Sequence, residues 1–175
     1  MRAKECLIPL FCFAFITPVY AKQVCNLAIP QLSGASFEDR GDGTIADKGS
    51  KLIWMRCAVT QSWKNGSCVD KPEKFDWENA KIAAQKVNHD PQYFYNDWRL
   101  PSLKEIAMIV DLRCKNPRLN LSVFPNTPSD SFWTSSSKLV DGPELKAYAM
   151  DFGSGGLVLS NVNTLHHVRL VRAAD

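Results

Sequence analysis

Residues 98–110 read Trp-Arg-Leu-Pro-Ser-Leu-Lys-Glu-Ile-Ala-Met-Ile-Val and contain the clearest helix start in the sequence. Ser102 and Glu105 have the spacing of a capping box, in which each side chain accepts a hydrogen bond from the other residue's backbone N–H. Pro101 fits the approach to a helix and would break the interior of one. Apolar residues then recur at helical spacing and predict one buried face: Leu103, Ile106, Ala107 and Val110. The stretch predicts a buried helix that runs to about residue 112.

The first 21 residues have the pattern of a secretory signal peptide. Arg2 and Lys4 precede an apolar run at residues 7–16, and Val19-Tyr20-Ala21 offers a small-residue cleavage site. The run is too short to span a bilayer as a stable anchor. We therefore expect cleavage after Ala21, export, and no stable membrane insertion of the mature chain. Periplasm, cell surface and secretion remain open as its location.

The composition suits one globular domain, because 45% of the residues are hydrophobic and 22% are charged. Cleavage after Ala21 removes Arg2, Lys4 and Glu5, so that 21 basic and 18 acidic residues become 19 and 17. The resulting net charge of +2 does not suit a dedicated nucleic-acid binder. A site for any other polyanion would have to be a local patch.

Four cysteines remain after cleavage: Cys25, Cys57, Cys68 and Cys114. An even number of cysteines in an exported chain predicts disulfides. Of the three possible pairings we favour Cys57–Cys68, because the residues between them look like a loop tip, and this leaves Cys25–Cys114. A four-cysteine zinc site is the rival, but the spacings lack the C-x-x-C pair that such sites usually show.

The mature chain divides into a linker-like lead at residues 22–36 and a domain at residues 37–175. Asp76 can cap a helix that runs from Trp77 to about Val87. Turn and strand patterns predict the other elements: strands around Phe37 and at residues 44–46, 52–57, 131–136, 147–152, 157–161 and 167–171, and loops at residues 58–74 and 116–130. A hairpin, two helices, a long loop and then antiparallel strands predict an α+β fold.

Short motifs along the domain add a family resemblance. They are Gly-Asp-Gly-Thr at 41–44 with Leu-Ile-Trp-Met-Arg at 52–56, Trp-Glu-Asn-Ala at 77–80, Trp-Arg-Leu-Pro-Ser at 98–102, Phe-Pro-Asn-Thr at 124–127, Phe-Trp-Thr-Ser-Ser at 132–136 and Val-Arg-Leu-Val-Arg at 168–172. In this order they resemble the C-terminal domain family of the Legionella collagen-like adhesin. The resemblance implies a C-type-lectin-like α+β fold with two helices, antiparallel strands and long loops.

Most of the matched residues are markers of the fold rather than of a site: Trp54, Trp98, Arg99, Pro101, Ser102, Glu105, Trp133 and Arg169. We expect Arg99 to pair with a buried acid or with backbone carbonyls. The resemblance also implies a function, because the domain of the namesake adhesin binds sulphated glycosaminoglycans as an oligomer. This chain lacks the collagen-like repeats that assemble the namesake, so its oligomeric state remains open.

The candidate ligand-binding residues are cations in the loops that flank the core: Lys64, Lys71, Lys74, Arg113, Lys115 and Arg118. If they converge, they could bind sulphate or phosphate groups with an affinity that falls as salt rises. The alternative is that they are solvated charges that keep an exported domain soluble. Arg169 and Arg172 are expected on opposite faces of the last strand, so they cannot form one patch.

Other chemistries find less support in the sequence. Asp39, Asp42 and Asp47 could hold Ca²⁺, but the EF-hand pattern is absent and turns explain these residues, so Ca²⁺ binding remains open. Arg-Gly-Asp at residues 40–42 is interpreted as a turn. The histidines match no catalytic motif and are expected at the surface: His89, His166 and His167. We therefore expect no enzyme, no cofactor and no metal site.

Two functional hypotheses follow from the sequence. The first is an exported, non-enzymatic binding module for adhesion-type recognition of a surface glycan or other polyanion. The alternative is a structural component of the bacterial envelope, such as a pilus-associated assembly subunit that binds another protein.

Overall fold

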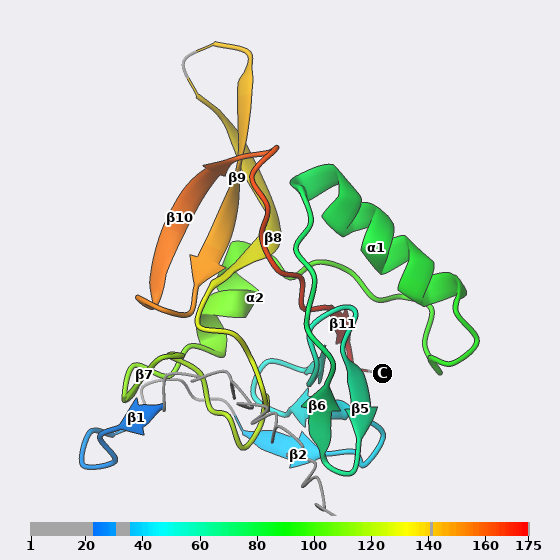
Figure 1. Ribbon diagram of the computed structural model, residues 1–175, viewed down its shortest axis with the longest axis vertical. Helices are drawn as coiled ribbons and strands as arrows, with labels where there is room; N and C mark the ends of the chain where they lie inside the picture. The colour runs from blue at the N-terminus through cyan, green and yellow to red at the C-terminus, as the bar shows by residue number, and fades with distance from the viewer. Residues whose placement is uncertain (1–22, 31–35, 141, 175) are drawn as a thin grey trace, which may run out of the picture.

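The computed structural model describes residues 23–30, 36–140 and 142–174. The predicted signal peptide and its cleavage site lie outside these residues. The described chain has an α+β fold, as the sequence predicts (Figure 1). Its elements in chain order are β1 (Val24–Cys25), β2 (Phe37–Asp39), β3 (Thr44–Asp47), β4 (Leu52–Met55), β5 (Ser62–Lys64), β6 (Ser67–Val69), α1 (Trp77–His89), α2 (Leu103–Met108), β7 (Cys114–Lys115), β8 (Ser131–Val140), β9 (Glu144–Asp151), β10 (Gly156–Asn161) and β11 (Val171–Ala173). No described helix is both long and apolar enough to cross a membrane.

One antiparallel sheet has the strand order β11-β4-β3-β2. The predicted strands at residues 44–46 and 52–57 appear as β3 and β4. Asp42 shapes the turn before β3, because its carboxylate accepts the backbone N–H of Thr44 at 2.9 Å. Gly43 follows with φ +86°, and a Cβ there would lie 2.8 Å from Trp63 Cβ, so both the backbone and the space require glycine.

A second antiparallel sheet has the order β10-β9-β8. The sequence predicts its first two strands as residues 131–136 and 147–152, whereas β8 and β9 run to Val140 and from Glu144. The extra residues pair with one another after a register shift between Trp133 and Ser137. They form an arm that extends beyond the rest of the molecule (Figure 1).

The predicted strand at residues 167–171 is wrong. His166 and His167 make only isolated bridges, to Phe75 and Phe132 respectively, and β11 begins at Val171. This segment passes from the edge of one sheet to the edge of the other, so it cannot pair continuously with either. Arg169 and Arg172 therefore do not share one strand, and Arg169 is fully buried.

The capping box predicted at Ser102 is present. Ser102 Oγ accepts the N–H of Glu105 at 3.3 Å, and Ser102 N donates to Glu105 Oε2 at 2.6 Å. The helix is shorter than predicted and ends at Met108, since Val110 bridges to Leu119 instead. The buried face also differs, because Ile106 and Ile109 are buried while Ala107 is exposed.

Arg99 pairs with the acid of the same motif. Its guanidinium donates to both carboxylate oxygens of Glu105, at 2.7 and 2.8 Å. The hydrogen bond from Arg99 is the main reason that the pKa of Glu105 falls to about 2. This bidentate contact fixes the strand-like entry at residues 98–101 to the first turn of α2.

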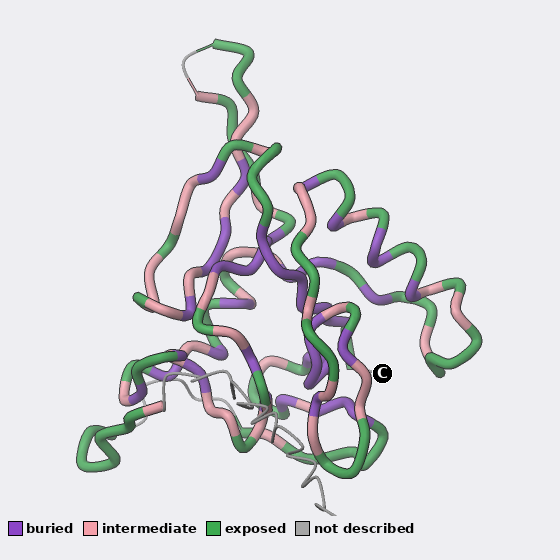
Figure 2. Tube along the Cα trace, viewed as in Figure 1, coloured by how far each residue is buried: buried purple, intermediate pink, exposed green. Residues whose placement is uncertain are grey.

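The helix α1 begins at the predicted residue and extends two residues beyond the predicted end. Asp76 caps it by accepting the N–H of Asn79 at 2.8 Å. The inner face of α1 carries small side chains and lies against the core (Figure 2): Ala80, Ala83 and Ala84 are all buried.

The core forms two clusters on the two faces of β8. Phe132 and Trp133 are neighbours in this strand and point to opposite faces. Trp133 packs in one cluster with Leu170, and Phe132 packs in the other with Trp54. The motif residues Trp54 and Trp133 are both fully buried, as expected for markers of the fold.

Both predicted disulfides, Cys57–Cys68 and Cys25–Cys114, are formed. The predicted loop at residues 58–74 is not wholly irregular, because it contains the hairpin β5–β6. The lead is also not simply a linker, since β1 pairs with β7 beside the second disulfide.

The capping box allows a direct test of how the start of α2 is stabilised. Ser102→Ala removes the acceptor for the N–H of Glu105, and we expect the free energy of unfolding to fall by about 1 kcal/mol. Urea unfolding measures this change. Ser135→Ala is the matched control, because Ser135 is exposed and its side chain makes no hydrogen bond within the described residues. Equal stability of the two variants would contradict a stabilising cap.

Candidate functional site

The six predicted cations lie in three places. Lys64 ends β5 and Lys71 follows β6, Lys74 precedes α1, and the others lie on β7 or next to it: Arg113, Lys115 and Arg118. The β5–β6 hairpin and β7 occupy opposite sides of the same end of the molecule, away from the β8–β9 arm (Figure 1). The structure therefore does not gather the six residues into one compact patch.

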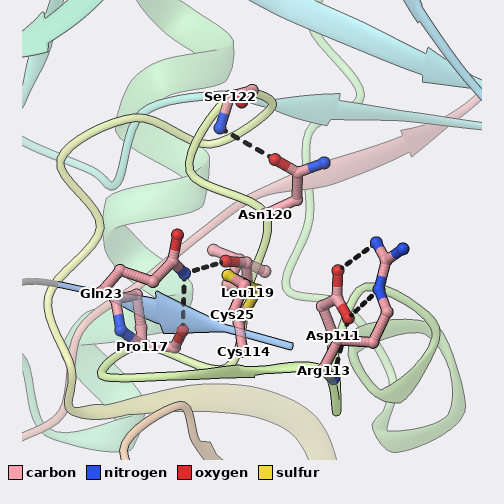
Figure 3. A network of polar contacts seen from close by, with 9 residues as sticks. All are labelled: Gln23, Cys25, Asp111, Arg113, Cys114, Pro117, Leu119, Asn120 and Ser122. Carbon is pink, nitrogen blue, oxygen red and sulfur yellow. Dashed lines mark hydrogen bonds and ion pairs between the residues drawn. A yellow bond between two sulfur atoms is a disulfide. The ribbon is translucent and has the colours of Figure 1, made fainter. Parts of the chain in front are cut away.

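Two of the six cations are paired with acids. Lys74 Nζ lies 2.5 Å from Asp130 Oδ2. The guanidinium of Arg113 donates to both oxygens of Asp111, at 2.9 and 2.7 Å (Figure 3). This hydrogen bonding lowers the pKa of Asp111. Both pairs are locally neutral and hold loops in place.

Three of the six are exposed and form no ion pair within the described residues: Lys64, Lys71 and Lys115. Arg118 is half-buried, and its side chain crosses Gly155, where an added Cβ would lie 2.1 Å from Arg118 Cδ. The backbone N–H of Arg118 donates to Phe152 O at 2.7 Å. Glycine at position 155 is thus what allows Arg118 to lie under the β9–β10 turn.

The segment that carries Lys115 and Arg118 is held from both sides (Figure 3). The Cys25–Cys114 disulfide joins it to β1. Gln23 Nε2 donates to Pro117 O at 2.7 Å and to Leu119 O at 2.6 Å. These bonds restrict the backbone between residues 114 and 119, and so they limit the positions that the two cations can take.

The segment that carries Lys64 is held in the same way. The Cys57–Cys68 disulfide joins β6 of the hairpin to the residues that follow β4. Asn126, in the Phe-Pro-Asn-Thr motif, donates to Cys68 O at 2.6 Å and so ties the hairpin to the long loop. The hairpin was missed in the sequence, although Asn65-Gly66 is a two-residue turn signal and both residues have positive φ, 51° and 77°.

A groove with a volume of about 480 Å³ runs along α1. Exposed or half-buried apolar side chains form much of its lining, including Ile82, Tyr93 and Leu165. The charged residues of its lining have both signs: Lys74, Lys86, Glu73, Asp76 and Asp90. This groove could not be predicted from the sequence, because its second wall comes from residues 59–60, 73–76 and 165, which are distant from α1 or from one another along the chain.

The expectation that the histidines lie at the surface is wrong for two of them. His166 and His167 are buried, whereas His89 is exposed. His166 Nε2 lies 2.8 Å from Ser160 Oγ, and His167 Nδ1 lies 2.9 Å from Glu73 O. Burial lowers the pKa of both imidazoles. The Ser160–His166 pair has the spacing of a hydroxyl and its base, and each of the two residues is 8% exposed.

The carboxylates considered for Ca²⁺ serve turns. Asp39 accepts the N–H of Gly41 at 2.8 Å and pairs with Arg56 at 2.5 Å. Asp42 accepts from Thr44, and Asp47 accepts the N–H of Gly49 at 3.1 Å. Within the described part of the chain, no three potential metal-ligating side chains come together.

Comparison with known proteins gives one family. The family model described as the Lcl C-terminal domain matches residues 43–172, which is most of the chain. No curated protein matches the chain.

The buried histidines predict a stability that depends on pH. Because their folded-state pKa values lie below the ordinary value of 6.5, the unfolded chain takes up protons first as pH falls. We expect the two histidines to leave the free energy of unfolding constant above about pH 6.5 and to lower it as the pH falls below this value. Urea unfolding at several pH values in this range should show that the free energy of unfolding changes less with pH in His166→Gln than in the unmodified protein. An identical pH dependence in the two proteins would refute the assignment.

Proposed function

The chain belongs to the Lcl C-terminal domain family, and from this membership we propose that it is an exported, non-enzymatic binding module for a surface glycan or other polyanion. We further propose that its α+β fold is C-type-lectin-like. The two helices, the antiparallel strands, the two disulfides and the ordered loop at residues 116–130 support this assignment.

The observation that carries the proposal is the placement of the free cations. Lys64 and Lys115 are exposed, unpaired within the described residues, and lie at the same end of the molecule (Figure 1). Each stands on a segment that a disulfide and side-chain hydrogen bonds hold in place. The two segments lie on opposite sides of that end, so a linear polyanion would have to span it to contact both, and the rigid attachment of the segments would reduce the entropy lost on binding. The attraction between exposed charges is screened by salt, so binding weakens as salt rises.

Export is supported by the chemistry of the cysteines. Disulfides persist in oxidising compartments such as the periplasm and the cell exterior. The two bonds observed here join segments that are 89 and 11 residues apart. Together with the signal-peptide pattern at residues 1–21, they support a location outside the cytoplasm for the mature domain.

The alternative function is binding to another envelope protein. The groove along α1 favours it, because Ile82 and Leu165 line this groove and are 44% and 55% exposed. Exposed apolar side chains beside polar ones are typical of protein contacts. A pull-down from an envelope extract that recovers one stable partner, unaffected by competing glycan, would favour this alternative over glycan binding.

Retention on immobilised heparin in a salt gradient tests the polyanion proposal. We expect the mature protein to bind at low salt, to elute as salt rises, and to be indifferent to EDTA. The double variant Lys64→Glu/Lys115→Glu should bind about tenfold more weakly, because two favourable charge contacts become repulsive.

The matched control is Lys104→Glu/Lys138→Glu, which changes the net charge equally at exposed positions on α2 and on the β8–β9 arm. Retention of this control should stay close to that of the unmodified protein. Equal losses in both double variants would show a general charge effect and no site at Lys64 and Lys115. No retention of the unmodified protein would reject heparin-like polyanions as ligands.

A further inference from the structure

Strand β10 forms an open edge of the sheet β10-β9-β8 (Figure 1). All six of its residues, Gly156–Asn161, pair with β9 on the inner side. On the outer side, no described segment continues the sheet. The one further backbone bond of this strand runs from Thr164 N to Asn161 O, within the turn that follows it.

The strand lacks the features that usually protect a sheet edge. Its sequence is Gly-Leu-Val-Leu-Ser-Asn, without charge or proline, and its pairing with β9 is regular and free of bulges. Edge strands normally carry one of these features, because an open edge recruits other strands. The edge strand β2 shows the contrast, since it has three residues and two of them are acids, Glu38 and Asp39.

The side chains of β10 also leave part of one face of this sheet uncovered. Leu157 is paired with Met150 and Leu159 with Tyr148, so both leucines lie on the face of the sheet that carries Met150. Met150 is 3% exposed, but Leu157 beside it is 55% exposed. The apolar face therefore continues past the covered core to the open edge.

We propose that β10 pairs with β10 of a second copy of this chain, antiparallel and across a two-fold axis. Two copies of an uncharged strand can pair without electrostatic repulsion, because no like charges then lie opposite one another. A register centred on Val158 places Leu157 opposite the partner's Leu159, and Leu159 opposite the partner's Leu157. The four leucines cover one another, and the two sheets become one continuous sheet. This inference is independent of the polyanion proposal.

Sedimentation velocity of the mature, oxidised protein across the micromolar range tests the pairing. We expect a monomer–dimer equilibrium that Leu157→Lys weakens by about tenfold or more, the factor that corresponds to 1.4 kcal/mol. Leu139→Lys is the matched control, since Leu139 is 66% exposed on the β8–β9 arm, and it should dimerise like the unmodified protein. Circular dichroism and thermal unfolding check that both variants fold.

Amide hydrogen exchange of the unmodified protein gives a second readout that does not depend on a variant. Exchange of β10 amides should slow as protein concentration rises, while exchange of β2 amides should not change. A protein that is monomeric at every concentration would overturn the proposal, even if β10 then accepts a strand of a different protein. A dimer that Leu157→Lys and Leu139→Lys affect equally, with no concentration effect at β10, would also overturn it.

Discussion

One buried arginine, Arg169, joins the end of β4 to the long loop at residues 116–130. The guanidinium of Arg169 is fully buried and, within the described residues, has no acid among its hydrogen-bond partners. It donates to the carbonyls of Met55, at 2.9 Å, and Arg56, and to Thr127 Oγ1 at 2.7 Å. Burial lowers its pKa to about 9, so the group remains charged at neutral pH. Carbonyl dipoles and the ring of Phe124, 4.8 Å away, take the place of a counter-ion.

This contact joins three parts of the chain that are distant in sequence: the end of β4, the long loop at residues 116–130 and the segment before β11. Arg56 extends the same junction, because it donates to the carbonyls of Ser122 and Val123 and lies over the ring of Trp63 in β5. The two arginines thereby fix the long loop and the β5–β6 hairpin to the core. Lys64 therefore lies on a strand that is fixed to the core, and Lys115 lies on β7, which the Cys25–Cys114 disulfide joins to β1.

The parts of the fold that depend on residues close together in the sequence could be predicted. The cap of α2 at Ser102 and Glu105 and the helix start after Asp76 are local, and the Cys57–Cys68 pairing spans only 11 residues. The burial of His166 and His167 could not be predicted, because it depends on a segment that passes between two sheets. The separation of the candidate cations into three places could not be predicted either, because tertiary contacts, such as that of Arg118 with Gly155, set their positions.

The most direct test of the role of Arg169 is the stability of Arg169→Met, measured by urea unfolding at neutral pH. Methionine fills a similar volume, but it leaves the two carbonyls and Thr127 without their donor. We predict a fall in the free energy of unfolding of about 2–4 kcal/mol, with faster amide exchange in residues 122–128 and in the β5–β6 hairpin. A variant as stable as the unmodified protein, as happens when the cost of burying a charge outweighs its contacts, would contradict the dependence of the structure on this arginine.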